Sequence, residues 1–157
     1  MDEGILIAIE TITANSDLLT ILINNIADNA NRHGFTDSSK KYKLAFFISS
    51  FFEKIEDKHE NSINPQIKGI SIEQVYLKIK IANNGNPFPD NFSLEKFVRK
   101  NSFAGETGNT GIGGYDINRI VQHHKGKLNL ITDDKIGEFS TIYEILIPAY
   151  ITESFKL

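Results

Sequence analysis

The chain has 157 residues, 40% hydrophobic and 24% charged, so it is long enough to bury one substantial core within the size range of a single domain. Its net charge of -3 gives no broad cationic surface, so neither nucleic acid nor an anionic membrane is expected as a direct partner. The absence of cysteine excludes disulfides, a thiolate nucleophile and Cys-ligated zinc, and no apolar run reaches the roughly 18 residues of a membrane span.

The first elements in chain order are a strand and a helix. The apolar run at 4–10 is typical of a strand, and Ser16 or Asp17 is a suitable N-cap for the helix that follows. Apolar residues then recur at helical spacing from Leu18 onward, and Gly34 is the expected C-terminal stop.

Two strands are predicted next. The segment 43–54 is rich in aromatic and β-branched residues, and 75–82 alternates apolar and polar residues. We interpret the polar segment between them, 55–74, as an exposed insertion within the domain. The second strand ends in Asn, Gly and Pro residues at 83–90, which predict a turn.

The last third of the chain predicts a short helix at 93–100, a glycine-bearing loop at 104–114, a helix at 115–125, and a hairpin of strands at 127–132 and 138–147. Strands and helices do not strictly alternate. We therefore expect an α+β two-layer sandwich, with one mixed, mostly antiparallel sheet covered on one face by helices. Residues 1–157 are expected to form one cytoplasmic domain, either complete or a piece of a longer protein.

The stretch 109–126, NTGIGGYDINRIVQHHKG, combines a glycine-bearing loop with the start of a helix. Backbone N–H groups at a helix N-terminus favour phosphate binding, although a plain glycine-rich connector fits the same pattern. There is no P-loop lysine, and no strand lies directly ahead of the glycines. His123 and His124 point about 100° apart on a helix, so this pair is not expected to chelate one metal ion.

Several segments of the sequence together favour phosphate binding over a plain glycine-rich connector. In order, and over about residues 17–148, the chain resembles the Bergerat-fold ATP-binding domain shared by histidine kinases, gyrase, mismatch-repair and heat-shock ATPases, most nearly the histidine-kinase branch. The matching segments are LINNIADNANRHGF, IANNGNPFP, FVRKNSF, NTGIGGYDINRIVQHHKG and EFSTIYEILIP.

For the first helix, the resemblance implies that Asn29 binds Mg²⁺, for which a side-chain carbonyl oxygen is a suitable hard ligand. Asn25 stands one turn earlier, where the hydrolysing relatives carry a glutamate. An amide cannot take a proton at neutral pH, so Asn25, a candidate catalytic and nucleotide-binding residue, favours phosphoryl transfer or binding over rapid hydrolysis. Arg32 and His33 extend the same face toward the phosphates, with Arg32 also a candidate catalytic residue; a solvated arginine and a helix-end histidine are the plainer alternatives.

For the base, the resemblance implies that Asn83 replaces an aspartate that accepts a hydrogen bond from the adenine amine. An amide is a weaker acceptor and can also donate, so purine selectivity is expected to loosen. Gly85 matches a glycine of the same box, whereas Pro87 replaces a second one. Thr141 matches a threonine that supports the adenine-binding carboxylate; a buried strand threonine bonded to the backbone is the alternative.

For the phosphates, the resemblance implies that Gly111 and Gly113 form the Gly-x-Gly of the glycine box and that Thr110 adds a hydroxyl. Arg99 and Lys100 are candidate cationic residues of a mobile lid over 97–109.

Three functions remain open from the sequence. The first is an ATP- and Mg²⁺-dependent domain that delivers a γ-phosphoryl group to a histidine on a separate phosphoacceptor or dimerisation segment or protein. The second is a nucleotide-gated module with slow or no turnover, and the third is a degenerate copy that acts only in protein–protein contacts. The segment HENSINP at 59–65 faintly resembles a phosphoacceptor box, but its proline is one residue too far along.

Overall fold

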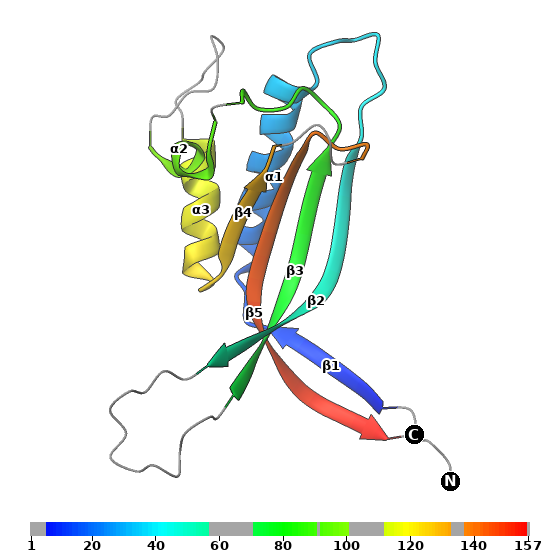
Figure 1. Ribbon diagram of the computed structural model, residues 1–157, viewed down its shortest axis with the longest axis vertical. Helices are drawn as coiled ribbons and strands as arrows, with labels where there is room; N and C mark the ends of the chain where they lie inside the picture. Colours follow the sequence, from blue (N-terminus) through cyan, green and yellow to red (C-terminus); the bar gives the residue numbers. More distant parts are fainter. Residues whose placement is uncertain (1–5, 57–70, 91, 101–111, 133–136, 157) are drawn as a thin grey trace.

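The computed structural model describes residues 6–56, 71–90, 92–100, 112–132 and 137–156. Its sheet has five strands, which pair in the order β1-β5-β3-β2, with β4 also pairing to β5 (Figure 1). The strands are β1 (Leu6–Ile12), β2 (Leu44–Glu56), β3 (Ser71–Asn83), β4 (Lys127–Ile131) and β5 (Thr141–Lys156). Every pairing is antiparallel, so the predicted mixed sheet contains no parallel pair among the described strands.

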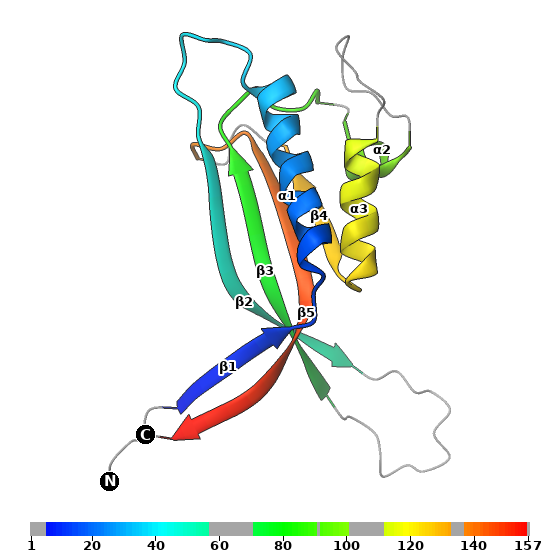
Figure 2. The same ribbon diagram turned by 180° about the vertical axis from the view of Figure 1, so that it is seen from behind.

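The helices lie on one face of this sheet, and Figure 2 shows α1 and α3 side by side in front of it. They are α1 (Ser16–Asn29), which continues into a π-helix, η1 (Ala30–Gly34), and then α2 (Leu94–Val98) and α3 (Gly113–His123). None of the described helices combines the length and the apolar character needed to cross a bilayer. The predicted α+β two-layer sandwich with helices on one face is confirmed.

The core lies between the helices and alternate residues of the strands. Tyr143, Ile145 and Ile147 of β5 are each 1% exposed, as the period of two along a strand requires. They pack with buried residues of the helices and of β3, namely Leu22, Ile26, Ile81, Phe97, Ile117, Ile120 and Val121. Burying one such isoleucine or leucine side chain contributes about 1.5–3 kcal/mol.

The other face of the sheet carries a cluster of charged side chains. Lys78 and Lys80 of β3 both pair with Glu144 of β5, at 3.8 and 3.2 Å. This alternation between an apolar helix-side row and a charged open-side row is what made β3 recognisable from its sequence.

The helix α1 begins at a different cap from the one predicted. The Asn15 side chain accepts a hydrogen bond from the Leu18 backbone N–H at 3.0 Å, so Asn15, and not Ser16 or Asp17, is the N-cap. Asparagine caps as well as serine or aspartate do, and the extended backbone of Asn15 suits that position. At the other end the predicted stop is confirmed, because the helical segment ends at Gly34.

Several predicted boundaries are shifted. The first strand runs over 6–12 instead of 4–10, and β3 begins at Ser71, earlier than the predicted residue 75, because its polar start pairs with β2. The strand β5 starts later and runs farther than 138–147, because its second half pairs with β1. The predicted insertion is therefore partly strand, and only residues 57–70 of it fall outside the described part.

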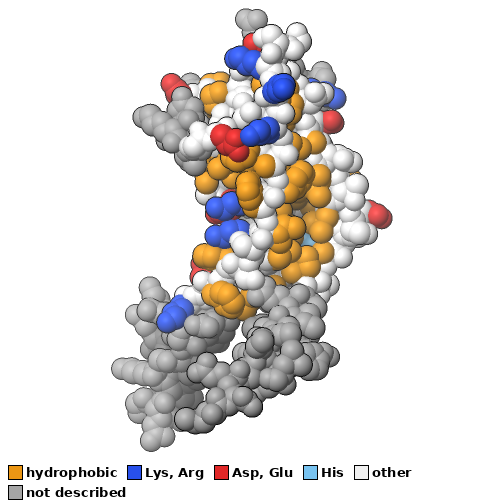
Figure 3. Space-filling model, turned by 90° about the vertical axis from the view of Figure 1, so that its right-hand side faces the viewer, with side chains coloured by type: hydrophobic (Ala, Val, Ile, Leu, Met, Phe, Trp, Pro, Cys, Tyr) orange, Lys and Arg blue, Asp and Glu red, His pale blue; other side chains and the backbone are white. Residues whose placement is uncertain are grey.

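The strand β2 lies at one edge of the sheet and carries exposed apolar side chains. Phe46 and Ile48 are 49% and 69% exposed although their cross-strand partners, Ile81 and Ile79, belong to the helix-side row. Directly opposite residues point to the same face, so β2 extends the apolar row beyond the cover of the helices. Figure 3 shows hydrophobic side chains gathered in a band along this side of the molecule.

Candidate functional site

Two adjoining cavities lie at the end of α1 and share Asn29, Arg32 and His33. The first, of about 230 Å³, is lined by Asn29, Ala30, Arg32, His33, Gly34, Thr36, Asn83, Asn86, Pro87, Phe88, Pro89, Thr141 and Tyr143. The second, of about 290 Å³, is lined by Asn25, Asp28, Asn29, Arg32, His33, Ile112, Gly113 and Asp116. The chain thus builds one mostly apolar compartment and one polar compartment on either side of the same three residues.

Asn29 is the last residue of α1 and stands between the cavities. A Cβ placed on Gly113 would lie 3.4 Å from Asn29 Oδ1, so the amide faces the first residue of α3. At that end of a helix the backbone N–H groups are unpaired and the dipole is positive. The structure therefore brings together the predicted metal ligand and the glycine segment, two parts that are far apart in the sequence.

Tyr143, which was not predicted as a site residue, forms a hydrogen bond with the Asn29 side chain. Burial raises the pKa of the Tyr143 hydroxyl, while a hydrogen bond with the Asn29 side chain acts in the opposite direction. Its ring packs against Phe97 with centroids 5.7 Å apart. The only signal in the sequence was a tyrosine in an otherwise aliphatic buried row, since a buried tyrosine needs a partner for its hydroxyl.

Asn83 and Thr141 lie opposite each other in the β3–β5 pairing and are only 3% and 2% exposed. Both line the first cavity. The Gly85 N–H donates to Asn83 Oδ1 at 3.1 Å. The two residues that the resemblance assigned to the base therefore form one buried polar end of this cavity.

Gly85 itself lines neither cavity. A Cβ on it would lie 2.6–2.7 Å from the backbone of Gly34, and the next N–H, of Asn86, donates to the Gly34 carbonyl at 2.9 Å. The glycine is needed so that the turn after β3 can approach the end of η1, which closes the first cavity.

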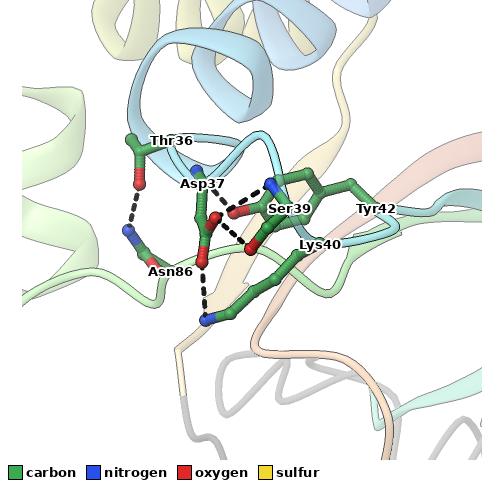
Figure 4. A network of polar contacts seen from close by, with 6 residues as sticks. All are labelled: Thr36, Asp37, Ser39, Lys40, Tyr42 and Asn86. Atoms are coloured by element: carbon green, nitrogen blue, oxygen red, sulfur yellow. Dashed lines mark hydrogen bonds and ion pairs between the residues drawn. The ribbon is translucent and has the colours of Figure 1, made fainter.

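A polar network holds the loop that follows η1 (Figure 4). Asn86 Nδ2 donates to Thr36 Oγ1 at 2.8 Å, and both residues line the first cavity. Next to them, the Asp37 N–H donates to the Tyr42 hydroxyl at 2.9 Å, and Ser39 donates twice to Asp37 Oδ1. These bonds from Ser39 hold the pKa of the Asp37 carboxyl below its usual range. The loop is thereby tied to the cavity rim.

Two carboxylates in the second cavity were also missed. Asp28 precedes Asn29 on α1, and Asp116 lies in the first turn of α3. Asn25 and Arg32 line the same cavity, as does His33. Asp116 could have been noticed as an acid within the glycine segment, but its approach to α1 depends on how the two helices pack.

The remaining predicted residues are not brought to the site. Arg99 and Lys100 follow α2, are exposed and line neither cavity. Thr110 and Gly111, most of the predicted lid at 97–109, and the segment 59–65 lie outside the described residues. Their predicted roles stay predictions.

His124 is a structural residue. It is buried, its Nδ1 lies 2.7 Å from the Ile120 carbonyl oxygen, and its Nε2 accepts from the Asn15 N–H at 3.0 Å. An acceptor at Nε2 places the ring proton on Nδ1, which donates to Ile120. This imidazole joins the end of α3 to the cap of α1, while His123 is exposed.

No protein-family model and no curated protein matches the chain. Among solved structures, the chain is similar to one described as "Mycobacterial sensor histidine kinase MprB". The TM-score is 0.57 over 91% of this chain and 80% of that chain, with 18% sequence identity. The chain therefore shares its fold with a sensor histidine kinase structure.

Proposed function

We propose that the chain binds a Mg²⁺–nucleotide complex across the two cavities and supplies a γ-phosphoryl group to a histidine on another segment or chain. ATP is the nucleotide that the sequence resemblance implies. The observation that carries the proposal is the approach of the Asn29 amide to Gly113 at the start of α3. It sets a hard oxygen ligand beside a helix N-terminus, which together suit a metal-bound phosphate chain.

The donor set of the second cavity fits Mg²⁺. Asn29 would hold the ion, and the carboxylate of Asp116 lines the same cavity. Mg²⁺ prefers one or two such oxygen ligands and takes the rest from water and phosphate. When bound, it supplies neutralisation of the phosphate charge. The Arg32 guanidinium, on the same cavity, would orient the phosphate oxygens.

Transfer is favoured over hydrolysis by Asn25. It lies one turn before Asn29 on the same cavity, and its amide cannot remove a proton from water. This residue equally favours a second function, a nucleotide-gated module with slow or no turnover that controls protein–protein contacts.

Asn29→Ala tests nucleotide binding. We expect calorimetry with Mg-ATP to show affinity at least about tenfold weaker than that of the native chain, because a metal ligand is lost. The difference should vanish when EDTA removes the metal. Asn24→Ala makes the same change at an exposed position of α1 and should bind as the native chain does. Equal affinity of native chain and Asn29→Ala would contradict the proposal.

The fate of radiolabelled γ-phosphate separates the two functions. Label retained on a protein histidine supports phosphoryl transfer. Bound and intact nucleotide supports the gated module, and rapid release of inorganic phosphate contradicts both.

A further inference from the structure

The buried amide of Asn83 is fixed in one orientation. An N–H group can only donate, so the hydrogen bond from Gly85 at 3.1 Å must end on the oxygen of Asn83 and not on its nitrogen. The backbone therefore settles which end is Oδ1, a choice that the shape of an amide alone leaves open. The other end, Nδ2, is a pure donor.

This donor has no acceptor among the described residues. Asn83 is 97% buried, and in the described part of the chain every fully buried side-chain nitrogen or oxygen has a hydrogen-bond partner. Nδ2 must therefore keep its small accessible surface in the cavity that Asn83 lines. A donor that faces a cavity can pair with an acceptor of a bound ligand, so this end of the cavity is suited to a ligand acceptor.

The surroundings narrow the chemistry of that acceptor. Thr141 lies opposite Asn83, is 98% buried, and carries a hydroxyl that can donate or accept. Much of the remaining wall is apolar, including Ala30, Phe88 and Pro89. A flat aromatic ring fits between such walls. Its polar edge would then face the Nδ2 donor of Asn83 and the Thr141 hydroxyl, which can donate or accept.

We infer that this cavity selects a base with a ring carbonyl, as in guanine and hypoxanthine, over adenine, an inference that rests on the proposed function. The carbonyl of a 6-oxopurine accepts from Asn83 Nδ2, and its neighbouring ring N–H donates to the Thr141 hydroxyl. The amino group of adenine would place its N–H against the N–H of Asn83 Nδ2, and two donors that face each other repel. The site therefore prefers a carbonyl at this position of the base, whereas a carboxylate at position 83 would prefer an amino group.

The test compares Mg²⁺ complexes of IDP, GDP and ADP by calorimetry, since diphosphates avoid turnover. In the native chain, IDP and GDP should bind roughly tenfold more tightly than ADP, the ratio expected from one hydrogen bond gained against one lost. Asn83→Asp should reverse the order, because a carboxylate accepts both from Gly85 and from the adenine amine. IDP carries no 2-amino group, so it isolates the carbonyl.

Asn24→Asp is the matched control. It adds the same charge at an exposed position of α1 that lines neither cavity, so the order of the three nucleotides should not change. Thermal melting of Asn83→Asp checks that it folds; the aspartate keeps the acceptor for Gly85. Tighter binding of ADP than IDP by the native chain, or an unchanged order in Asn83→Asp, overturns the inference and leaves the proposed function standing. Failure of all three nucleotides to bind overturns both.

Discussion

At the scale of single residues, Asn29 is held by a side chain from another element. Tyr143 reaches it from β5 through a hydrogen bond, while its ring packs against Phe97. An amide that must keep its oxygen toward a metal gains from such support, because a second partner restricts its rotation. The hydroxyl of Tyr143 is thus a positioning group for the proposed ligand.

Tyr143→Phe tests that role while keeping the ring. At neutral pH we expect the free energy of unfolding to fall by about 1 kcal/mol, the net worth of one hydrogen bond. The affinity for Mg²⁺-nucleotide should fall more than the affinity measured in EDTA. Urea denaturation and calorimetry measure the two effects, with Tyr115→Phe, at a residue that lines neither cavity, as control. A loss of affinity that is equal with and without metal would show a merely structural role.

The same variant changes the dependence of stability on alkaline pH. Burial raises the pKa of Tyr143 above its usual value of 10.0, so the unfolded chain ionises first as pH rises. The stabilising contribution is complete below about pH 10 and is lost at about 1.4 kcal/mol per pH unit above it. The difference in unfolding free energy between about pH 9 and about pH 11 should therefore be smaller in Tyr143→Phe than in the native chain.

At the scale of elements, two adjacent glycines at the start of α3 have different tasks. A Cβ on Gly114 would collide with the carbonyl oxygen of Phe97 at the end of α2, whereas one on Gly113 would only touch the Asn29 side chain at 3.4 Å. The extra glycine after the Gly-x-Gly pattern is therefore explained by the close packing of α2 on α3. The helix α3 begins at Gly113, two residues before the predicted start at 115. Glycine is a weak helix former, so the sequence does not predict a helix over these two residues.

Gly114→Ala should destabilise the fold by about 1–3 kcal/mol, because backbone cannot move aside as a side chain can. Gly113→Ala should stay within about 1 kcal/mol of the native chain, because the better helix propensity of alanine offsets mild crowding. Chemical denaturation of the two variants measures the difference. Equal losses would mean that α2 does not approach α3 as closely as described.

At the scale of the whole molecule, the unpaired edge of β2 is the feature that most favours self-association. Among the described strands, none pairs with its outer side, and Phe46, Phe47, Ile48 and Phe52 are all at least 49% exposed. Long apolar edges without inward charge or proline are templates for pairing with another chain.

Ile48→Lys should reduce light scattering at high protein concentration, because a charge on an edge strand opposes pairing. The cost in stability should be within about 0.5 kcal/mol, since Ile48 is 69% exposed. Asn24→Lys adds the same charge on the exposed side of α1 and separates the effect of net charge. A similar reduction by both variants would assign the effect to charge alone.

Much of this architecture could be predicted from periodicity, because burial on one face imposes it. The alternation in β3 and the helical spacing in α1 both follow from the core that they share. Contacts between distant elements could not be predicted this way. Nothing in the local pattern shows that Tyr143 meets Asn29, or that Asp116 comes to face α1, since these depend on how helices and sheet pack.

The π-turn of η1 has one consequence for changes in chain length. The Phe35 N–H bonds to the carbonyl of Ala30, five residues back, so this turn holds one residue more than an ordinary helical turn. Deleting Asn31 would let α1 run on regularly into the loop. The guanidinium and imidazole that follow Asn29 would then swing by about 100°, out of the cavities they share. The additional residue of this turn therefore sets the direction in which the Arg32 and His33 side chains point.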